Sequence, residues 1–119
     1  MESTAFEVRA IVKYVPMSPR KVRLVINQVR GLVVDEALAI LKFTPKAAAK
    51  PVSKVIESAI ANAEENYGLS REDLYVSQIF ADVGPTQKRW KAGARGRVKP
   101  RLKRSSHITV VLGEMEVGS

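Results

Sequence analysis

The chain has 119 residues, which is enough for one ordinary domain and too few for two. It carries 20 Lys and Arg against 12 Asp and Glu, and 45% of its residues are hydrophobic, so a folded core is expected. The absence of Cys excludes disulfides and thiolate metal sites. The sequence contains no run of about 18 apolar residues, which a membrane-spanning helix would need. The N-terminus lacks the pattern of a signal peptide. These features predict a soluble intracellular protein.

The first predicted element is a strand over residues 6–15. Apolar and polar residues alternate through this segment, with Ile11 as the one exception. A period of two residues is typical of a strand with one buried face. Pro16 cannot donate to a hydrogen-bond ladder, so the strand is expected to end there.

A helix is predicted to begin at Ser18–Pro19, where Ser can cap and Pro suits the first helical position. Its apolar residues follow helical spacing at positions 22, 25, 26 and 29, and Gly31 is a candidate C-cap. The opposite side is basic. It consists of Arg20, Arg23, Asn27 and Arg30, beside Lys21. This edge is as typical of a solvated helix face as of an RNA contact.

Two further helices follow. Asp35 and Glu36 suit the first turn of the second helix, whose apolar side is Ala37, Leu38, Ile40 and Leu41. Thr44–Pro45 is expected to end that helix and start the third. Pro51 either kinks the third helix or starts its main part. The buried stripe expected on that helix consists of Val52, Val55, Ile56, Ala59, Ile60 and Ala63.

Residues 66–68 are expected to stop the third helix, and Ser70 with Asp73 resembles a capping box. Two strands are then predicted, over residues 74–83 and 105–112. If they pair antiparallel, the intervening residues form a long hairpin that turns near Ala92–Gly93. Each side of that hairpin holds about eleven residues, or roughly 35 Å at ~3.3 Å per residue.

The positive charge lies in that hairpin. Residues 1–87 carry 11 basic and 10 acidic side chains, and no acid occurs between Asp82 and Glu114. Solvated faces usually mix both signs of charge, so this segment indicates a polyanionic partner, most commonly nucleic acid. Residues 84–104 are here called the arm, and residues 1–83 and 105–119 the body of the single domain. The arm's nine cations are Lys88, Arg89, Lys91, Arg95, Arg97, Lys99, Arg101, Lys103 and Arg104.

Catalysis has little support, because His107 is the only His and no nucleophile or zinc constellation can be assembled around it. We therefore expect no enzyme, no metal and no cofactor.

Trp90, among the arm's cations, fits base stacking and cross-strand packing equally well. The rival function is an architectural protein that grips the DNA minor groove with a basic ribbon. Such arms usually carry a large apolar wedge at the tip, which Ala92–Gly93–Ala94 does not supply.

Several stretches resemble the bacterial large-subunit ribosomal protein family number twenty-two (L-twenty-two). They occur in the family's order and spacing over nearly the whole chain. They are SPRKVRLVINQVRG (18–31), KVIESAIANAEEN (54–66), GPTQKRWKAGARGR (84–97) and LKRSSHITVV (102–111). The resemblance implies an α+β fold, with three helices packed on a small three-stranded antiparallel sheet and a long protruding basic β-hairpin.

The resemblance also implies a function. It implies a structural constituent of the large subunit in the cytoplasmic ribosome, with a body near the exit and a hairpin that threads ribosomal RNA and lines the nascent-peptide tunnel. Expected partners are large-subunit RNA, neighbouring ribosomal proteins and the nascent polypeptide, with no membrane and no homo-oligomer. The expected RNA-binding residues are Arg20, Lys21, Arg23, Lys88, Arg89, Arg95, Arg97, Lys99, Arg101, Lys103, Arg104, Ser106 and His107.

The expected tunnel-lining tip comprises residues 87–93. By matching position, three of them fall in the part of the hairpin that constricts the tunnel, namely Gln87, Lys88 and Arg89, and they are followed by Trp90, Lys91, Ala92 and Gly93. One departure concerns the tip. Where the family commonly shows Pro-Arg, this chain has Ala92–Gly93, so the tip has one cation and one rigid residue fewer.

Overall fold

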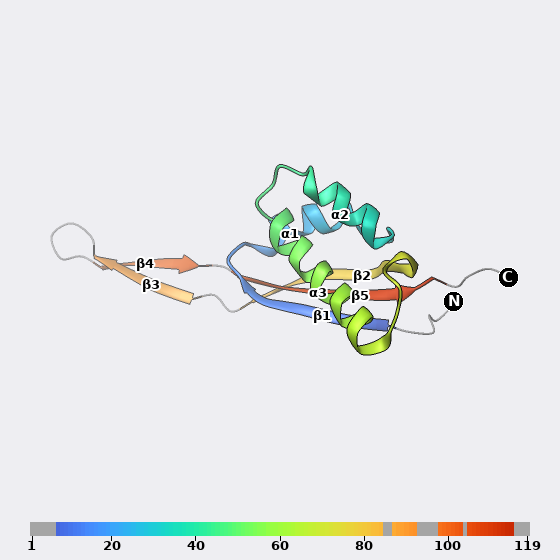
Figure 1. The fold of residues 1–119 in the computed structure, drawn as a ribbon. Helices are drawn as coiled ribbons and strands as arrows, with labels where there is room; N and C mark the ends of the chain where they lie inside the picture. Colours follow the sequence, from blue (N-terminus) through green and yellow to red (C-terminus); the bar gives the residue numbers. More distant parts are fainter. Residues whose placement is uncertain (1–6, 85–86, 93–97, 104, 116–119) are drawn as a thin grey trace.

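The structure is a computed structural model that describes residues 7–84, 87–92, 98–103 and 105–115, with the backbone alone described for 87–92 and 98–103. Three helices and a three-stranded sheet form the body, and a two-stranded ribbon lies beyond one end of that sheet (Figure 1). The elements in chain order are β1 (Glu7–Val15), α1 (Pro19–Ile26), α2 (Val34–Lys42), α3 (Ala49–Tyr67), the 3₁₀ turn η1 (Arg71–Asp73), β2 (Leu74–Val83), β3 (Gln87–Ala92), β4 (Val98–Lys103) and β5 (Ser106–Glu114).

The body's sheet is antiparallel in the order β1-β5-β2, so the last strand lies between the other two. The three helices lie on one side of it (Figure 1). The alternation predicted for the first strand is confirmed from Val8 to Val12, because Val8 and Ala10 are buried while Arg9 and Ile11 are exposed. It is wrong beyond that point, because the register shifts between Val12 and Val15, which leaves Tyr14 60% exposed and Val15 buried. The predicted strand at 74–83 matches β2, and the predicted strand at 105–112 matches β5, which extends to Glu114.

The core is one continuous cluster between the helices and the sheet. All six residues of the stripe predicted for the third helix are buried in it, from Val52 to Ala63. Pro51 occupies the first turn of α3, so the interpretation that it starts the helix is confirmed. Gly68 ends the helix in the left-handed conformation, with φ 63°, as a C-cap glycine should. None of the described helices is long and apolar enough to cross a lipid bilayer.

Capping was predicted less well. Ser18 occupies the N-cap position of α1 but makes no side-chain capping bond, and the same holds for Ser70 before η1. Gly31 does not cap α1, which ends at Ile26. Instead Gly31 has φ 85°, and its amide donates to the Val76 carbonyl. The chain leaves the helix early because this segment must run beside β2.

Two features of the helices also differ from the prediction. Ile40 was expected on the apolar side of the second helix but is 36% exposed. The buried stripe of α2 is narrow, comprising Val34, Ala37 and Leu41, and a residue next to Leu41 points about 100° away from it. The third helix begins at Ala49 rather than directly after Pro45, because residues 46–48 form a turn.

The arm contains an antiparallel ribbon, as predicted, in which β3 pairs with β4 from Gln87↔Lys103 to Ala92↔Val98. Ala92 is therefore a ladder residue rather than part of the turn, and Gly93, the other residue of the expected turn, lies outside the described residues. Val83 pairs with Ser106 in the body, and Gln87 pairs with Lys103 in the ribbon. Gln87 lies four positions after Val83, but Lys103 lies only three positions before Ser106, so the pairing register of the ribbon differs by one residue from that of the body. The molecule measures 73 × 27 × 26 Å along its principal axes.

The first testable prediction concerns the independence of body and arm. The Gly84 amide donates to the Ser105 carbonyl at 2.9 Å, so these residues already form a closed end of the β2–β5 ladder. Replacing residues 85–104 with an Asn-Gly turn should keep the body folded, because the buried cluster is built from β1, β2, β5 and the helices. Circular dichroism should show one cooperative thermal transition within a few degrees of the full chain. A broad, non-cooperative melt would show instead that the arm is needed for folding.

Candidate nucleic-acid interface

The ribbon brings residues of like charge directly opposite one another. Arg89 lies across from Arg101, and Lys91 lies across from Lys99. Facing like charges destabilise a strand pair, and a two-stranded ribbon is marginal in water on its own. The sequence offers no acid between Asp82 and Glu114 to neutralise them. An external anion would remove this repulsion, so the ribbon is suited to a polyanionic partner.

The structure places most of the predicted arm residues within that ribbon. Trp90 lies opposite Pro100, and Pro100 fits there because each strand of a two-stranded ribbon has one unpaired side. Gly93, Arg95, Arg97 and Arg104 lie outside the described residues. The predicted residues located in β3 or β4 are Gln87, Lys88, Arg89, Trp90, Lys91, Ala92, Lys99, Arg101 and Lys103.

The arm joins the body through a closely packed root. A Cβ on Gly84 would lie 2.4 Å from the Ser105 hydroxyl oxygen and 3.3 Å from Cε1 of the His107 ring. A side chain at position 84 would force the Ser105 hydroxyl to move and would lie 3.2 Å from the Ser105 carbonyl carbon, so glycine is favoured where β2 leaves the body. Sequence analysis did not single out Gly84 and missed this packing role.

His107 is fixed at this root by Tyr14. The Tyr14 amide donates to His107 Nδ1 at 3.1 Å, and the two rings pack edge to face with centroids 5.0 Å apart. Because Nδ1 accepts this bond, Nε2 carries the proton of the neutral imidazole and remains a donor. Tyr14 adopts φ 60° within an irregular stretch of β1, where the register with β5 shifts between Val12 and Val15. Sequence analysis did not identify Tyr14, since its partner lies 93 residues away.

Ser106 is buried, although the resemblance implies that it contacts RNA. Its side chain is completely buried, and its hydroxyl donates to the Met17 carbonyl at 2.6 Å. It thereby ties the start of β5 to the segment between β1 and α1. Since the hydroxyl is enclosed, we do not include Ser106 among the RNA-contacting residues proposed below.

The basic edge of α1 also divides into two kinds of residue. Arg20 and Lys21 are exposed. Arg23 donates to the Ala81 carbonyl at 2.8 Å, and Arg30 donates to the Ile79 carbonyl at 2.8 Å, so both guanidinium groups bind the backbone of β2. Their charge remains at the surface, but part of their hydrogen-bonding capacity joins the helix region to the sheet.

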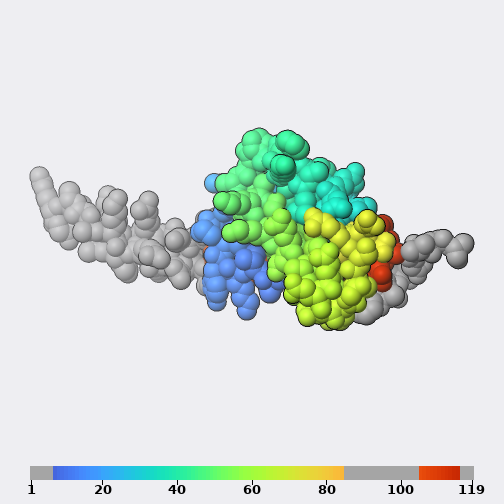
Figure 2. Space-filling model, viewed as in Figure 1, coloured from blue at the N-terminus to red at the C-terminus, as the bar shows by residue number. Residues whose placement is uncertain are grey.

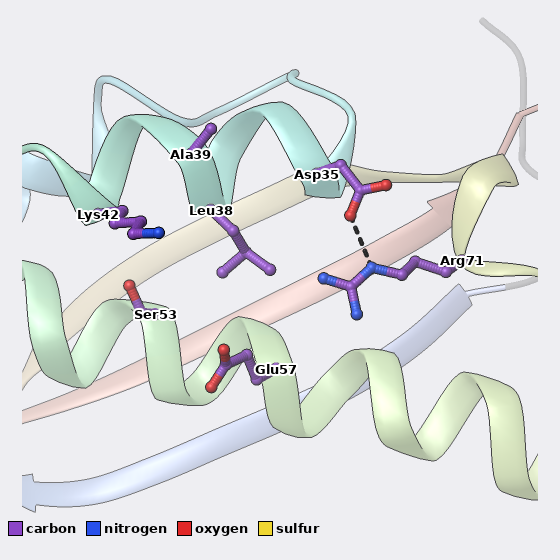
Figure 3. Close-up of a pocket in the computed structure, with 7 residues that line it drawn as sticks. All are labelled: Asp35, Leu38, Ala39, Lys42, Ser53, Glu57 and Arg71. Atoms are coloured by element: carbon purple, nitrogen blue, oxygen red, sulfur yellow. Dashed lines mark hydrogen bonds and ion pairs between the residues drawn. The ribbon is translucent and has the colours of Figure 1, made fainter.

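A separate hollow lies between α2, α3 and η1 (Figure 3). Its volume is about 410 Å³, and an ion pair between Arg71 Nε and Asp35 Oδ1, 2.6 Å apart, forms one side of it. The hydrogen bond to Asp35 raises the pKa of Arg71. The cation and anion satisfy each other. Within the described part of the chain, no group of three His, Asp or Glu side chains is placed to hold a metal ion.

Comparison with known proteins matches residues 10–113 to the family described as "Ribosomal protein L22p/L17e". The "Large ribosomal subunit protein uL22" of Thermoanaerobacter sp. (strain X514) is 58% identical over 110 residues, covering 92% of this chain and 99% of the relative. The protein of the same name from Finegoldia magna is 56% identical over 111 residues, covering 93% and 99%. That from Carboxydothermus hydrogenoformans is 52% identical over 112 residues, covering 94% and 99%.

The root of the arm generates the second prediction. Ser106→Ala removes the buried donor to the Met17 carbonyl and should lower the free energy of unfolding by about 1–3 kcal/mol. The RNA affinity of the folded protein should not change, because the hydroxyl is enclosed. Urea denaturation measures the first effect and filter binding the second. Ser58→Ala on the exposed face of α3 is the control and should stay within about 0.5 kcal/mol of wild type. Equal stability of the two variants would contradict the assigned role.

Proposed function

The chain belongs to the ribosomal protein L22p/L17e family, and from this premise we propose that its arm binds large-subunit ribosomal RNA and lines the nascent-peptide exit tunnel with its tip. Membership makes the chain a structural constituent of the large ribosomal subunit in the cytoplasmic ribosome, and not an enzyme. Ribosomal RNA and neighbouring ribosomal proteins are the corresponding partners. RNA binding by the arm and contact with the nascent chain are the steps proposed here.

One observation carries the RNA-binding proposal. The ribbon holds like charges at facing positions and has no acid of its own to neutralise them. Binding of Lys and Arg to phosphates releases condensed counterions, which supplies most of the affinity for nucleic acid. The same cations that destabilise the free ribbon therefore stabilise the complex. Arg adds forked hydrogen bonds to phosphate oxygens and stacking on unpaired bases.

The shape of the molecule supports the same proposal. Each described strand of the ribbon has six residues, or about 20 Å at ~3.3 Å per residue. The ribbon lies beyond the Gly84–Ser105 end of the β2–β5 ladder, so a narrow element projects from a broad one (Figure 1). Such a ribbon can enter a passage between RNA helices that the body is too wide to enter.

The RNA-contacting set that we propose combines the arm with the exposed part of the body near it. In the body it includes Arg20, Lys21 and the outward side of His107, with Arg23 contributing charge while it binds the Ala81 carbonyl. In the arm it consists of Lys88, Arg89, Arg95, Arg97, Lys99, Arg101, Lys103 and Arg104.

The tip is assigned by resemblance and by local composition. Residues 87–93 match the tunnel-lining part of the family's hairpin, and Gln87, Lys88 and Arg89 match its constricting part. Cations become sparse at Ala92–Gly93–Ala94, where small residues would leave the lumen open. Trp90 and Lys91 are then the large side chains nearest to a passing polypeptide.

Salt dependence tests the RNA-binding proposal. If six to nine cations of the arm meet phosphates, the logarithm of the affinity for large-subunit RNA should fall against the logarithm of salt concentration with a slope of about −4 to −8. Filter binding between 50 and 300 mM KCl measures it. A slope shallower than about −2 would mean that the cations are mostly solvated.

Site-specific crosslinking tests the tunnel proposal. A photo-crosslinker at Lys91 should capture the nascent peptide in stalled ribosomes, whereas one at Lys21, exposed on the body and outside the ribbon, should capture RNA alone. The captured species are identified by gel mobility with labelled nascent chain. If the probe at position 91 reaches only RNA across several nascent chains, the tip of this chain does not line the tunnel, although RNA binding by the arm would stand.

A further inference from the structure

Two neighbouring hollows of the body share a wall beside the root of the arm. One, of about 570 Å³, lies between the β1–α1 connection and the turn that precedes α3. The other, of about 380 Å³, lies along the end of β1 and the first turns of α3. Pro16, Met17 and Ala47 line both. The segments that form them meet on the face shown in Figure 2, where the blue N-terminal residues adjoin the green start of α3.

Among the described residues, those with charged side chains that line the two hollows are all cations. Lys21 and Lys46 border the first, and Lys13, Lys50 and Lys54 border the second. All five side chains are exposed. Among the residues that the structure describes, the one ion pair joins Arg71 to Asp35, so none of these lysines forms an ion pair with a described carboxylate.

This arrangement costs the body stability. Lys50 and Lys54 are four residues apart on α3 and therefore repel each other on one helix face. The first turn of α3 contains no acid to offset Lys50. As in the ribbon, an external anion would convert this repulsion into attraction.

The uncharged part of the hollows is suited to a nucleotide. Its lining consists of proline, methionine, alanine, leucine and valine side chains, and Tyr14, 60% exposed, stands beside them in the second hollow. Flat aromatic rings at a basic surface stack on unpaired bases, while lysines bind the phosphates as point charges. Tyr14 also contacts His107 at the root, so the surface is continuous with the base of the arm.

We propose that these five lysines form a second RNA-binding surface, here called the lysine groove, which takes the sugar–phosphate backbone of an unpaired RNA segment and stacks a base on Tyr14. This inference rests on the proposed function, since it assumes that the chain binds large-subunit RNA. The groove holds the body against RNA, and the arm extends from it into the RNA interior.

The test compares three variants of the full chain, each lacking two cations. Lys50→Gln with Lys54→Gln alters the groove, Lys99→Gln with Arg101→Gln alters the arm, and Arg9→Gln with Lys42→Gln is a control with the same change of net charge at exposed positions outside both. The probe is a transcript of large-subunit ribosomal RNA. Circular dichroism first verifies that each variant is folded.

The groove variant should bind about tenfold more weakly than wild type at 150 mM salt, with a salt slope shallower by about 1.4–1.8, which is the contribution of two phosphates. The control should change the slope by less than about 0.5. Replacement by Lys50→Arg with Lys54→Arg should restore both values. Tyr14→Ala should weaken binding without changing the slope.

Two results would contradict the proposal that the lysine groove binds RNA. In one, its variant matches the control while the arm variant binds weakly, which leaves the proposed function standing. In the other, its variant binds the transcript normally but is lost from purified subunits, which would assign the groove to an acidic protein. A failure of the proposed function itself looks different, because wild type would then show a slope shallower than about −2 and the arm variant would bind like wild type.

Discussion

The pairing of β5 with both of its neighbours is the constraint on which the molecule depends. β5 is the last strand in sequence and the central one in space, so the sheet cannot be completed until the chain has returned from the arm. Its residues from Ile108 to Leu112 are buried on both faces. The start of β5 is fixed twice, by the Ser106 hydroxyl on the Met17 carbonyl and by His107 on the Tyr14 amide. The body therefore sets the position and direction of the arm at its root.

Stability comes from the core of the body, whereas the proposed binding residues lie in the arm and on the surface of the body. The body buries one continuous apolar cluster, which offsets the conformational entropy lost on folding. The ribbon adds facing cations, whose repulsion opposes its own pairing. A single domain can carry such a ribbon because the ladder of β2 and β5 closes at Gly84 and Ser105, before the charged residues begin. The repulsion is thus kept outside the core, and in the proposed complex RNA neutralises it.

The sequence predicted the elements well because their signals are local. The alternation in β1, the stripe of α3 and the composition of β2 each lie within a short window, and each was located to within a few residues. The errors arose where tertiary contacts override local preference. Gly31 was given a capping role that fits the pattern, but its amide is required by Val76 of β2. The contacts of Tyr14 with His107 and of Ser106 with Met17 span about 90 residues, and no local pattern could have revealed them.

The distribution of charge over the folded body is also a feature that counting along the sequence does not reveal. Counted along the sequence, the body is nearly neutral, with 11 basic and 10 acidic side chains over residues 1–87. The fold separates these charges. Asp35, Glu36, Glu64, Glu65 and Glu72 lie at the start of α2, the end of α3 and in η1, at the end of the body away from the ribbon (Figure 1). The lysine groove lies at the ribbon end, where Asp82 is the exception.

A body with one acidic end and one basic end is oriented by an electric field. The field of a polyanion attracts the lysine groove and the arm and repels the acidic end, so it turns the molecule arm-first before contact. In the proposed complex the arm enters a confined space while the body stays outside, so an encounter in any other orientation would be unproductive. The separation of charge within a nearly neutral body therefore sets the orientation of the molecule as it approaches the RNA, and the β2–β5 ladder sets the position of the arm on the body.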